Sequence, residues 1–219
     1  MSARRITVVS AGIGQPSSTR LLADRLATAT VRRLADEGID TTVDVVELRD
    51  VAHDITNNLL AGFASPALEA AIAAVTGADG VIAVTPVYTT SYSGLFKSFI
   101  DSLDPQALAG MPVLLGATGG TERHSLALDY AMRPLFTYLH AVTVPTAVYA
   151  ASADWGSGED AAVGSLPQRI ERAAGEFAAL VRASDRSSRI VDPFELPAGF
   201  DPSGAGSRGL STVGAFGAE

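Results

Sequence analysis

Three short segments rich in hydroxyl-bearing and small residues each follow an apolar run that is typical of a buried strand. Hydroxyls and free backbone N–H groups at the start of a helix suit a phosphate monoester. In the first segment a serine could instead only cap the helix, and this alternative stays open. The candidate cofactor-binding residues are Ser10, Gln15, Ser17, Ser18 and Thr19 in the first segment, Pro86, Val87, Tyr88 and Thr89 in the second, and Thr118, Gly119, Gly120 and Thr121 in the third.

The second and third segments suit a flat aromatic ring. The two consecutive glycines of the third segment let the backbone approach such a ring closely. Tyr88 and Tyr92 offer stacking area and a polar hydroxyl. The backbone amides of Tyr88 and Thr89 are candidates for hydrogen bonds to the ring, and residues 118–121 would serve its pyrimidine end. A phosphate in one loop and a ring between two others is the layout that FMN requires.

Other nucleotide-site patterns do not fit this chain. Gly12 and Gly14 form a G-x-G, but Pro16 and Ser17 follow where the dinucleotide fingerprint continues to a third glycine. The chain has no Gly-Lys-Ser/Thr, so a P-loop is excluded. A phospho-accepting receiver domain needs an aspartate at the end of the third strand, where this chain has Thr85 and Pro86.

The composition excludes several further classes. The net charge of -8 and a single lysine, Lys97, argue against non-specific nucleic-acid binding. Without cysteine there is no disulfide, thiol catalysis or cysteine-bound metal, and the three scattered histidines make no metal site. The N-terminus does not resemble a signal peptide, and no apolar run reaches the roughly 20 residues of a membrane span. We expect a soluble cytoplasmic protein.

Strands and helices must alternate to bring the three segments together. Apolar runs predict five strands, and 3.6-residue spacing predicts the helices between them. This alternation indicates an α/β domain with a doubly wound parallel sheet in the order 2-1-3-4-5, where strands one, three and four end at one edge. We expect this domain to span residues 1–183 and a flexible tail rich in Gly, Ser and Pro to span 184–219. The expected strands are residues 5–10, 41–47, 81–85, 112–117 and 142–148, and the main expected helices are residues 19–37, 95–103, 125–139 and 166–181 and one that starts at Pro66.

Three local expectations follow from residue type. Pro86 lacks an N–H group, so we expect the third strand to end there. Residues 53–64 predict irregular or weakly helical structure. Pro134 lies within the helical pattern of residues 125–139 and leaves the carbonyl of Tyr130 without its partner, so that helix must kink or bulge.

A series of motifs extends across most of the chain. They are Ser65-Pro66-Ala67-Leu68, Ala78-Asp79-Gly80, Thr85-Pro86-Val87-Tyr88 with Tyr92-Ser93-Gly94 and Lys97, Ala117-Thr118-Gly119-Gly120-Thr121, and Leu126-Ala127-Leu128-Asp129-Tyr130-Ala131. In order and spacing they resemble the NAD(P)H-dependent FMN reductases, and most of all those of alkanesulfonate assimilation and those partnered with luciferase-like monooxygenases. The resemblance covers residues 6–148. The first loop departs from the commoner Gly-Ser-x-Arg form.

The resemblance implies a flavodoxin-like fold, with FMN and NADH or NADPH as cofactors. It implies hydride transfer from the nicotinamide to FMN and release of reduced FMN to an oxygenase. It also implies a homodimer or homotetramer, in which Tyr130 lies at a bulge against a neighbouring subunit.

Several alternatives remain open at this point. Arg20 could pair with the phosphate or be a solvated helix residue, and Lys97 could support the ring or form an ion pair with Asp101. His124 could face the flavin or be exposed. At the level of function, the alternatives are a quinone or azo reductase that uses a bound flavin, and an electron carrier without NAD(P)H activity.

Overall fold

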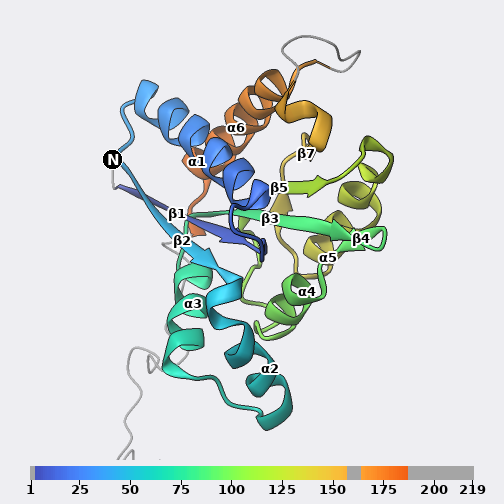
Figure 1. Cartoon of the computed structure of the whole chain (residues 1–219). Helices are drawn as coiled ribbons and strands as arrows, with labels where there is room; N and C mark the ends of the chain where they lie inside the picture. Colours follow the sequence, from blue (N-terminus) through green and yellow to red (C-terminus); the bar gives the residue numbers. More distant parts are fainter. Residues whose placement is uncertain (1–2, 157–163, 187–219) are drawn as a thin grey trace, which may run out of the picture. The chain divides into compact units, whose positions relative to one another are not determined.

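The computed structural model describes residues 3–156 and 164–186, and Figure 1 shows a sheet with helices on both sides. The tail expected from residue 184 onward therefore falls mostly outside the described residues. The surface loop that Gly156, Ser157 and Gly158 predict also falls mostly outside the described residues.

The sheet is confirmed as doubly wound, parallel and flavodoxin-like. Its order is β2-β1-β3-β5-β6, β7 also pairs with β5, and β4 pairs antiparallel with β3. The expected order 2-1-3-4-5 is recovered, with β6 and β7 sharing the fifth position and one short strand added. The strands are β1 (Arg4–Ser10), β2 (Thr41–Glu47), β3 (Gly80–Tyr88), β4 (Ser91–Tyr92), β5 (Pro112–Gly119), β6 (Val142–Thr143) and β7 (Val148–Ala151).

Alternate residues of the central strands face two separate cores. Val8 and Val84 belong to the core under the first and last helices, whereas Val9 and Ala83 belong to the core on the opposite face. The period of two in each strand therefore places helices on both faces of the sheet. In Figure 1, α1 and α6 lie together on one face and α3, α4 and α5 lie on the other. The helices are α1 (Ser18–Asp36), α2 (Ala52–Ala61), α3 (Pro66–Thr76), α4 (Gly94–Asp101), α5 (Arg133–Tyr138) and α6 (Leu166–Ala183).

The expectation that the third strand ends at Pro86 is wrong, because β3 continues to Tyr88. The carbonyl of Val84 accepts a hydrogen bond from the Ala11 N–H at 2.9 Å, so Val84 faces β1. Alternate residues of a strand face the same neighbour, so Pro86 also faces the side of β1. At the level of Pro86, however, β1 has already ended and the chain has turned away from β3. The missing N–H of the proline therefore costs no ladder bond, and Pro86 stays in register with Thr118 on the β5 side.

The fifth strand expected at residues 142–148 is not continuous. β6 and β7 are separated by four residues that include Pro145, which has no N–H to offer. In this gap the Arg133 guanidinium donates to the carbonyls of Val144 at 2.8 Å and Pro145 at 3.0 Å. Side-chain donors thus satisfy carbonyls that a regular strand would pair with its neighbour.

Of the irregular or weakly helical structure expected at residues 53–64, the helical alternative is confirmed up to Ala61. A short 3₁₀ turn, Leu48–Val51, leads directly into α2. Ile55 is fully buried in the core, and Gly62 ends the helix in the left-handed conformation at φ 80°. Burial and the glycine cap stabilise a segment whose local propensity for helix is low.

The helix expected at residues 125–139 is interrupted as its proline predicts. A π-helical turn, Leu128–Met132, precedes α5, and the Arg133 N–H donates to the Leu128 carbonyl five residues back. The bulge at Tyr130 is therefore confirmed, and the Tyr130 side chain is 79% exposed. Its contact with a neighbouring subunit remains a prediction.

No group of three or more His, Cys, Asp or Glu side chains could hold a metal ion within residues 3–156 and 164–186. In the same residues no single helix is long and apolar enough to cross a membrane, and only the bent pair of residues 48–61 and 66–76 reaches that length and composition together.

Candidate functional site

A cleft of about 360 Å³ opens where β1, β3 and β5 end. Its volume lies in the range of roughly 300–1,000 Å³ that small-molecule sites span. Segments that are far apart in the sequence thus meet at one edge of the sheet, as the strand order requires. Of the candidate residues, the cleft is lined by Ser17, Ser18, Thr19, Pro86, Val87, Tyr88, Thr118, Gly119 and Gly120.

The first loop ends in the N-terminus of α1. The Ser17 Oγ accepts a hydrogen bond from the Arg20 N–H at 3.2 Å, so Ser17 does cap the helix and also lines the cleft. Helix geometry leaves the first N–H groups of α1, at Ser18 and Thr19, without intrahelical partners. A Cβ added to Gly12 would lie 2.1 Å from the Ser17 Oγ, so glycine is required for the close approach of the loop to its cap. These features suit an anion at the N-terminus of α1.

The first and third loops are joined by a direct hydrogen bond. The Oγ1 atoms of Thr19 and Thr118 lie 2.8 Å apart, and both residues are 3% exposed. Each hydroxyl can donate to or accept from the other. This bond holds the start of α1 against the end of β5 beneath the cleft.

The third loop is held from behind by Tyr149 of β7. Its hydroxyl donates to the Thr121 carbonyl at 2.8 Å. A Cβ added to Gly119 would lie 2.1 Å from the same hydroxyl oxygen. Burial is the main cause that raises the pKa of Tyr149, followed by the negative charges of Asp154 and Glu122. The tyrosine therefore stays protonated and shapes the loop.

The second loop is a tight β-hairpin rather than an open turn. β3 and β4 are joined by Thr89 and Thr90, which have φ of 49° and 72°, as the two central residues of a type I′ turn do. At its base the Ser93 N–H donates to the Thr85 Oγ1 at 3.0 Å, and the Ser93 Oγ accepts from the first turn of α4. The hairpin presents Tyr88, which is 47% exposed, at the cleft.

Four candidate residues do not line the cleft. Ser10 is 1% exposed, and within the described residues its buried Oγ has no hydrogen-bond partner. Gln15 lies beside Arg49, whose Nη1 is 2.8 Å from the amide oxygen when that oxygen faces the guanidinium. Thr89 lies in the hairpin turn, and Thr121 uses its carbonyl to bind the hydroxyl of Tyr149. Binding of the flavin by these four residues remains a prediction.

The charged residues near the first loop pair with each other. Arg20 donates to Asp24 at 2.8 Å and to Glu47, and the bond to Asp24 is the main cause that raises its pKa. Arg49 binds the other oxygen of Glu47 at 2.7 Å. Neither arginine lines the cleft, so the phosphate-pairing alternative for Arg20 has no support in its geometry. Lys97 forms the expected exposed ion pair, 2.6 Å from Asp101.

Two further cleft residues have no signal in the sequence. Ser152 and Trp155 belong to a 3₁₀ turn, Ser152–Trp155, that follows β7. This turn lies beside the third loop because β7 pairs with β5 up to Gly119 and Ala151. Only the strand pairing reveals this neighbourhood. The remaining lining comes from the first loop.

The lining fits a phosphorylated flavin. Gly12 and Gly119 let the first and third loops pack closely against the Ser17 and Tyr149 hydroxyls, which shapes the two loops that line the cleft. Hydroxyls and helix N–H groups provide neutral phosphate donors, whereas Pro86, Val87 and Tyr88 provide an apolar wall.

Comparisons with known proteins agree with this fit. The family described as NADPH-dependent FMN reductase matches residues 4–156. An FMN reductase (NADPH) from Pseudomonas aeruginosa is 40% identical over 153 residues, which cover 69% of this chain and 78% of that protein. The NADH-dependent FMN reductase SfnF from Pseudomonas fluorescens is 39% identical over 151 residues, which cover 69% and 78%.

A solved structure also matches closely. An oxidoreductase from Corynebacterium diphtheriae has 42% sequence identity to this chain and a TM-score of 0.79. The match covers 84% of this chain and all of that one. On sequence and fold together, the chain belongs to the NADPH-dependent FMN reductase family.

Proposed function

We propose that the cleft holds FMN during its reduction by NADH or NADPH, and that reduced FMN then passes to a flavin-dependent monooxygenase. Family membership makes the chain an NAD(P)H:FMN oxidoreductase. The observation that carries the proposed location is that Ser17, Tyr88 and Gly119, from three separate loops, line one cleft.

The phosphate is assigned to the N-terminus of α1. Ser17 and Ser18 place hydroxyls there, and the helix dipole favours a negative charge. The described lining contains no lysine or arginine, so neutral donors hold the anion. Arg20 and Arg49 remain paired with Glu47 behind the loop.

The ring is assigned to the space between Tyr88 and Gly119. Bound FMN supplies the ring that accepts the hydride, so no side chain of the protein needs to act as an acid or base. The protein positions the two nucleotides and excludes water between them. Tyr88 offers a half-exposed aromatic face, and the loop held by Tyr149 offers backbone groups.

Transfer to a monooxygenase is supported by the motifs shared with reductases that have such partners. Steady-state oxidation of NADH and of NADPH with FMN as the varied substrate tests the reductase itself. Saturable dependence on free FMN is expected, whereas turnover of quinones or azo dyes without free FMN would favour the bound-flavin alternative. No NAD(P)H oxidation and a stable semiquinone would identify an electron carrier. Light emission from bacterial luciferase supplied with this protein, FMN and NAD(P)H tests the transfer.

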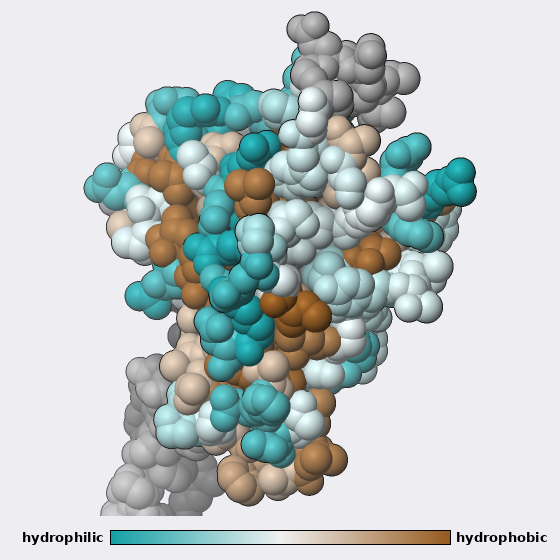
Figure 2. Space-filling model, viewed as in Figure 1, coloured by the Kyte–Doolittle hydropathy of each residue, from teal (hydrophilic) through white to brown (hydrophobic). Residues whose placement is uncertain are grey.

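A homo-oligomer and a cytoplasmic location belong to the same proposal. Exposed apolar side chains gather at the end of α2, where Leu60 is 83% and Phe63 is 74% exposed, and Figure 2 shows this hydrophobic surface at the lower end of the molecule. Tyr130 projects from the π-helical turn. Light scattering of the purified protein is expected to give a dimer or tetramer, and Phe63→Ser or Tyr130→Ser to weaken it. A wild-type monomer would contradict this assignment.

A further inference from the structure

Trp155 contributes an aromatic surface to the cleft that neither the motifs nor the strand ends indicate. It lines the cleft together with the loops assigned to FMN, and it is the single tryptophan of the chain. Its side chain is partly buried and also packs against the core under α1 and α6. Trp155 therefore connects the helix layer with the ligand space.

The turn that carries Trp155 is held by the side chain of Asp154. The Asp154 carboxylate accepts a hydrogen bond from the Ala151 N–H at 2.8 Å, which ties the turn to β7. The same carboxylate pairs with Arg169 of α6, which also donates to the Tyr149 carbonyl. The backbone of Trp155 is thus held by neighbours on β7 and α6, in a place set by the fold.

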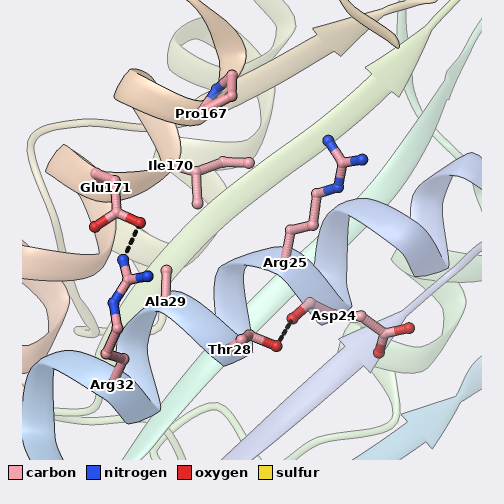
Figure 3. A pocket seen from close by; sticks show the side chains of 8 residues that line it. All are labelled: Asp24, Arg25, Thr28, Ala29, Arg32, Pro167, Ile170 and Glu171. Carbon is pink, nitrogen blue, oxygen red and sulfur yellow. Dashed lines mark hydrogen bonds and ion pairs between the residues drawn. The ribbon is translucent and has the colours of Figure 1, made fainter.

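Arg25 of α1 holds the indole itself. Its guanidinium carbon lies 5.0 Å from the centroid of the Trp155 ring, within the range of a cation–π contact. By contrast, Arg32 and Arg33 on the same helix pair with Glu171. Figure 3 shows the Arg25 side chain extending away from the Arg32–Glu171 pair. Arg25 does not line the flavin cleft, so it contacts the indole from outside the cleft.

We infer that Trp155 is a wall of the flavin site and that Arg25 is its positioning residue. This inference rests on the proposed function, because it assigns a further contact to the same FMN. An indole adds apolar contact area and removes water from the cleft, which strengthens the polar contacts that hold the phosphate. The guanidinium restricts the rotamers of the indole before the ligand arrives, so less ordering is needed on binding.

Fluorine NMR tests the contact in the unmutated chain. Protein labelled with 5-fluorotryptophan has a single ¹⁹F resonance, because it has one tryptophan. Addition of FMN is expected to shift this resonance by more than its line width, because ring currents act only over a few ångströms. Inorganic phosphate, the control ligand, should leave it in place. An unmoved resonance at FMN concentrations that equilibrium dialysis shows to be saturating would overturn the inference.

Variants test the positions separately. Trp155→Ala is expected to raise the Kd for FMN about tenfold, and Trp155→Phe, which keeps a ring, to raise it less. Arg25→Gln should shift the ¹⁹F resonance of the ligand-free protein. It should also raise the Kd for FMN about two- to fivefold, because losing the cation–π contact costs on the order of half the binding free energy that Trp155→Ala loses. Arg32→Gln on the same helix and Tyr138→Ala at an exposed aromatic are matched controls with unchanged Kd.

The outcomes separate this inference from the proposed function. If the wild type fails to bind FMN in dialysis, the proposed function fails. If the wild type binds FMN and Ser17→Ala weakens binding, but Trp155→Ala and Trp155→Phe do not, the proposed function stands and the role of Trp155 is refuted. If Arg25→Gln behaves as Arg32→Gln does in both measurements, Arg25 is not a positioning residue.

Discussion

The Oγ1 atoms of Thr19 and Thr118 lie 2.8 Å apart in a buried hydrogen bond between residues 99 positions apart in the chain. Thr19 lies in the first turn of α1, and Thr118 lies near the end of β5. The loop assigned to the phosphate and the loop assigned to the ring are therefore coupled below the cleft. Removal of either hydroxyl should therefore change both the free energy of unfolding and the affinity for FMN.

Replacing one partner of this pair leaves the other hydroxyl buried without a partner. Thr118→Val should lower the free energy of unfolding by about 1–3 kcal/mol and weaken FMN binding. The double variant Thr19→Val/Thr118→Val removes both hydroxyls with little change of shape and should recover much of that stability. Urea denaturation of Thr118→Val, Thr19→Val and the double variant measures the effect. Additive losses in the double variant would show that the two hydroxyls do not interact.

Gly119 has no room for a side chain because of the Tyr149 hydroxyl. Gly119→Ala should displace the third loop and weaken FMN binding about tenfold or more. Tyr149→Phe removes the oxygen that lies 2.1 Å from the added Cβ, so the double variant should recover part of the loss. The matched control for stability is Gly120→Ala, since a Cβ there meets nothing within 4 Å. Equal destabilisation by the two alanines would contradict this assignment.

Ser17 is assigned two roles, helix cap and phosphate ligand, that one substitution can separate. Ser17→Asp keeps an effective cap, so the free energy of unfolding should change by less than about 0.5 kcal/mol. Its negative charge should repel the phosphate and raise the Kd for FMN while leaving that for riboflavin, which has no phosphate, unchanged. Isothermal titration with both flavins measures this. An equal loss for the two flavins would place the phosphate elsewhere.

Tyr149 should make stability depend on alkaline pH. Burial raises its pKa in the folded protein above the ordinary value of 10.0, so the unfolded chain loses this proton first as pH rises. Its stabilising effect is complete below pH 10 and is lost as pH rises through the higher folded value. The free energy of unfolding of the wild type should therefore fall more steeply above pH 10 than that of Tyr149→Phe. Parallel curves for the two proteins would refute this.

Patterns confined to one segment could be predicted from the sequence. The bounds of β2 agree with the expectation, and Ser65 caps α3 through the Leu68 N–H at 3.2 Å. The interruption of the helix near Tyr130 follows from the position of Pro134, whereas its form as a bulge follows from the family resemblance. Local residue types determine the strand bounds, the cap and the interruption, so no distant contact is needed to predict them.

Features that depend on distant partners could not be predicted. The continuation of β3 through Pro86 depends on β1 turning away from that side, which the proline itself does not reveal. The place of Trp155 in the cleft depends on the pairing of β7 with β5 and on Arg25 of α1. Gln15 is a candidate by residue type, and it lies beside Arg49 rather than in the cleft lining. Tertiary contacts decide these positions.

The most direct test of the central claim is a crystal structure of this protein with FMN. The account predicts the phosphate at Ser17 and Ser18 on the N-terminus of α1, with the ring between Tyr88 and Gly119. FMN bound away from these loops, or a phosphate paired with Arg20 instead of the helix N-terminus, would contradict it.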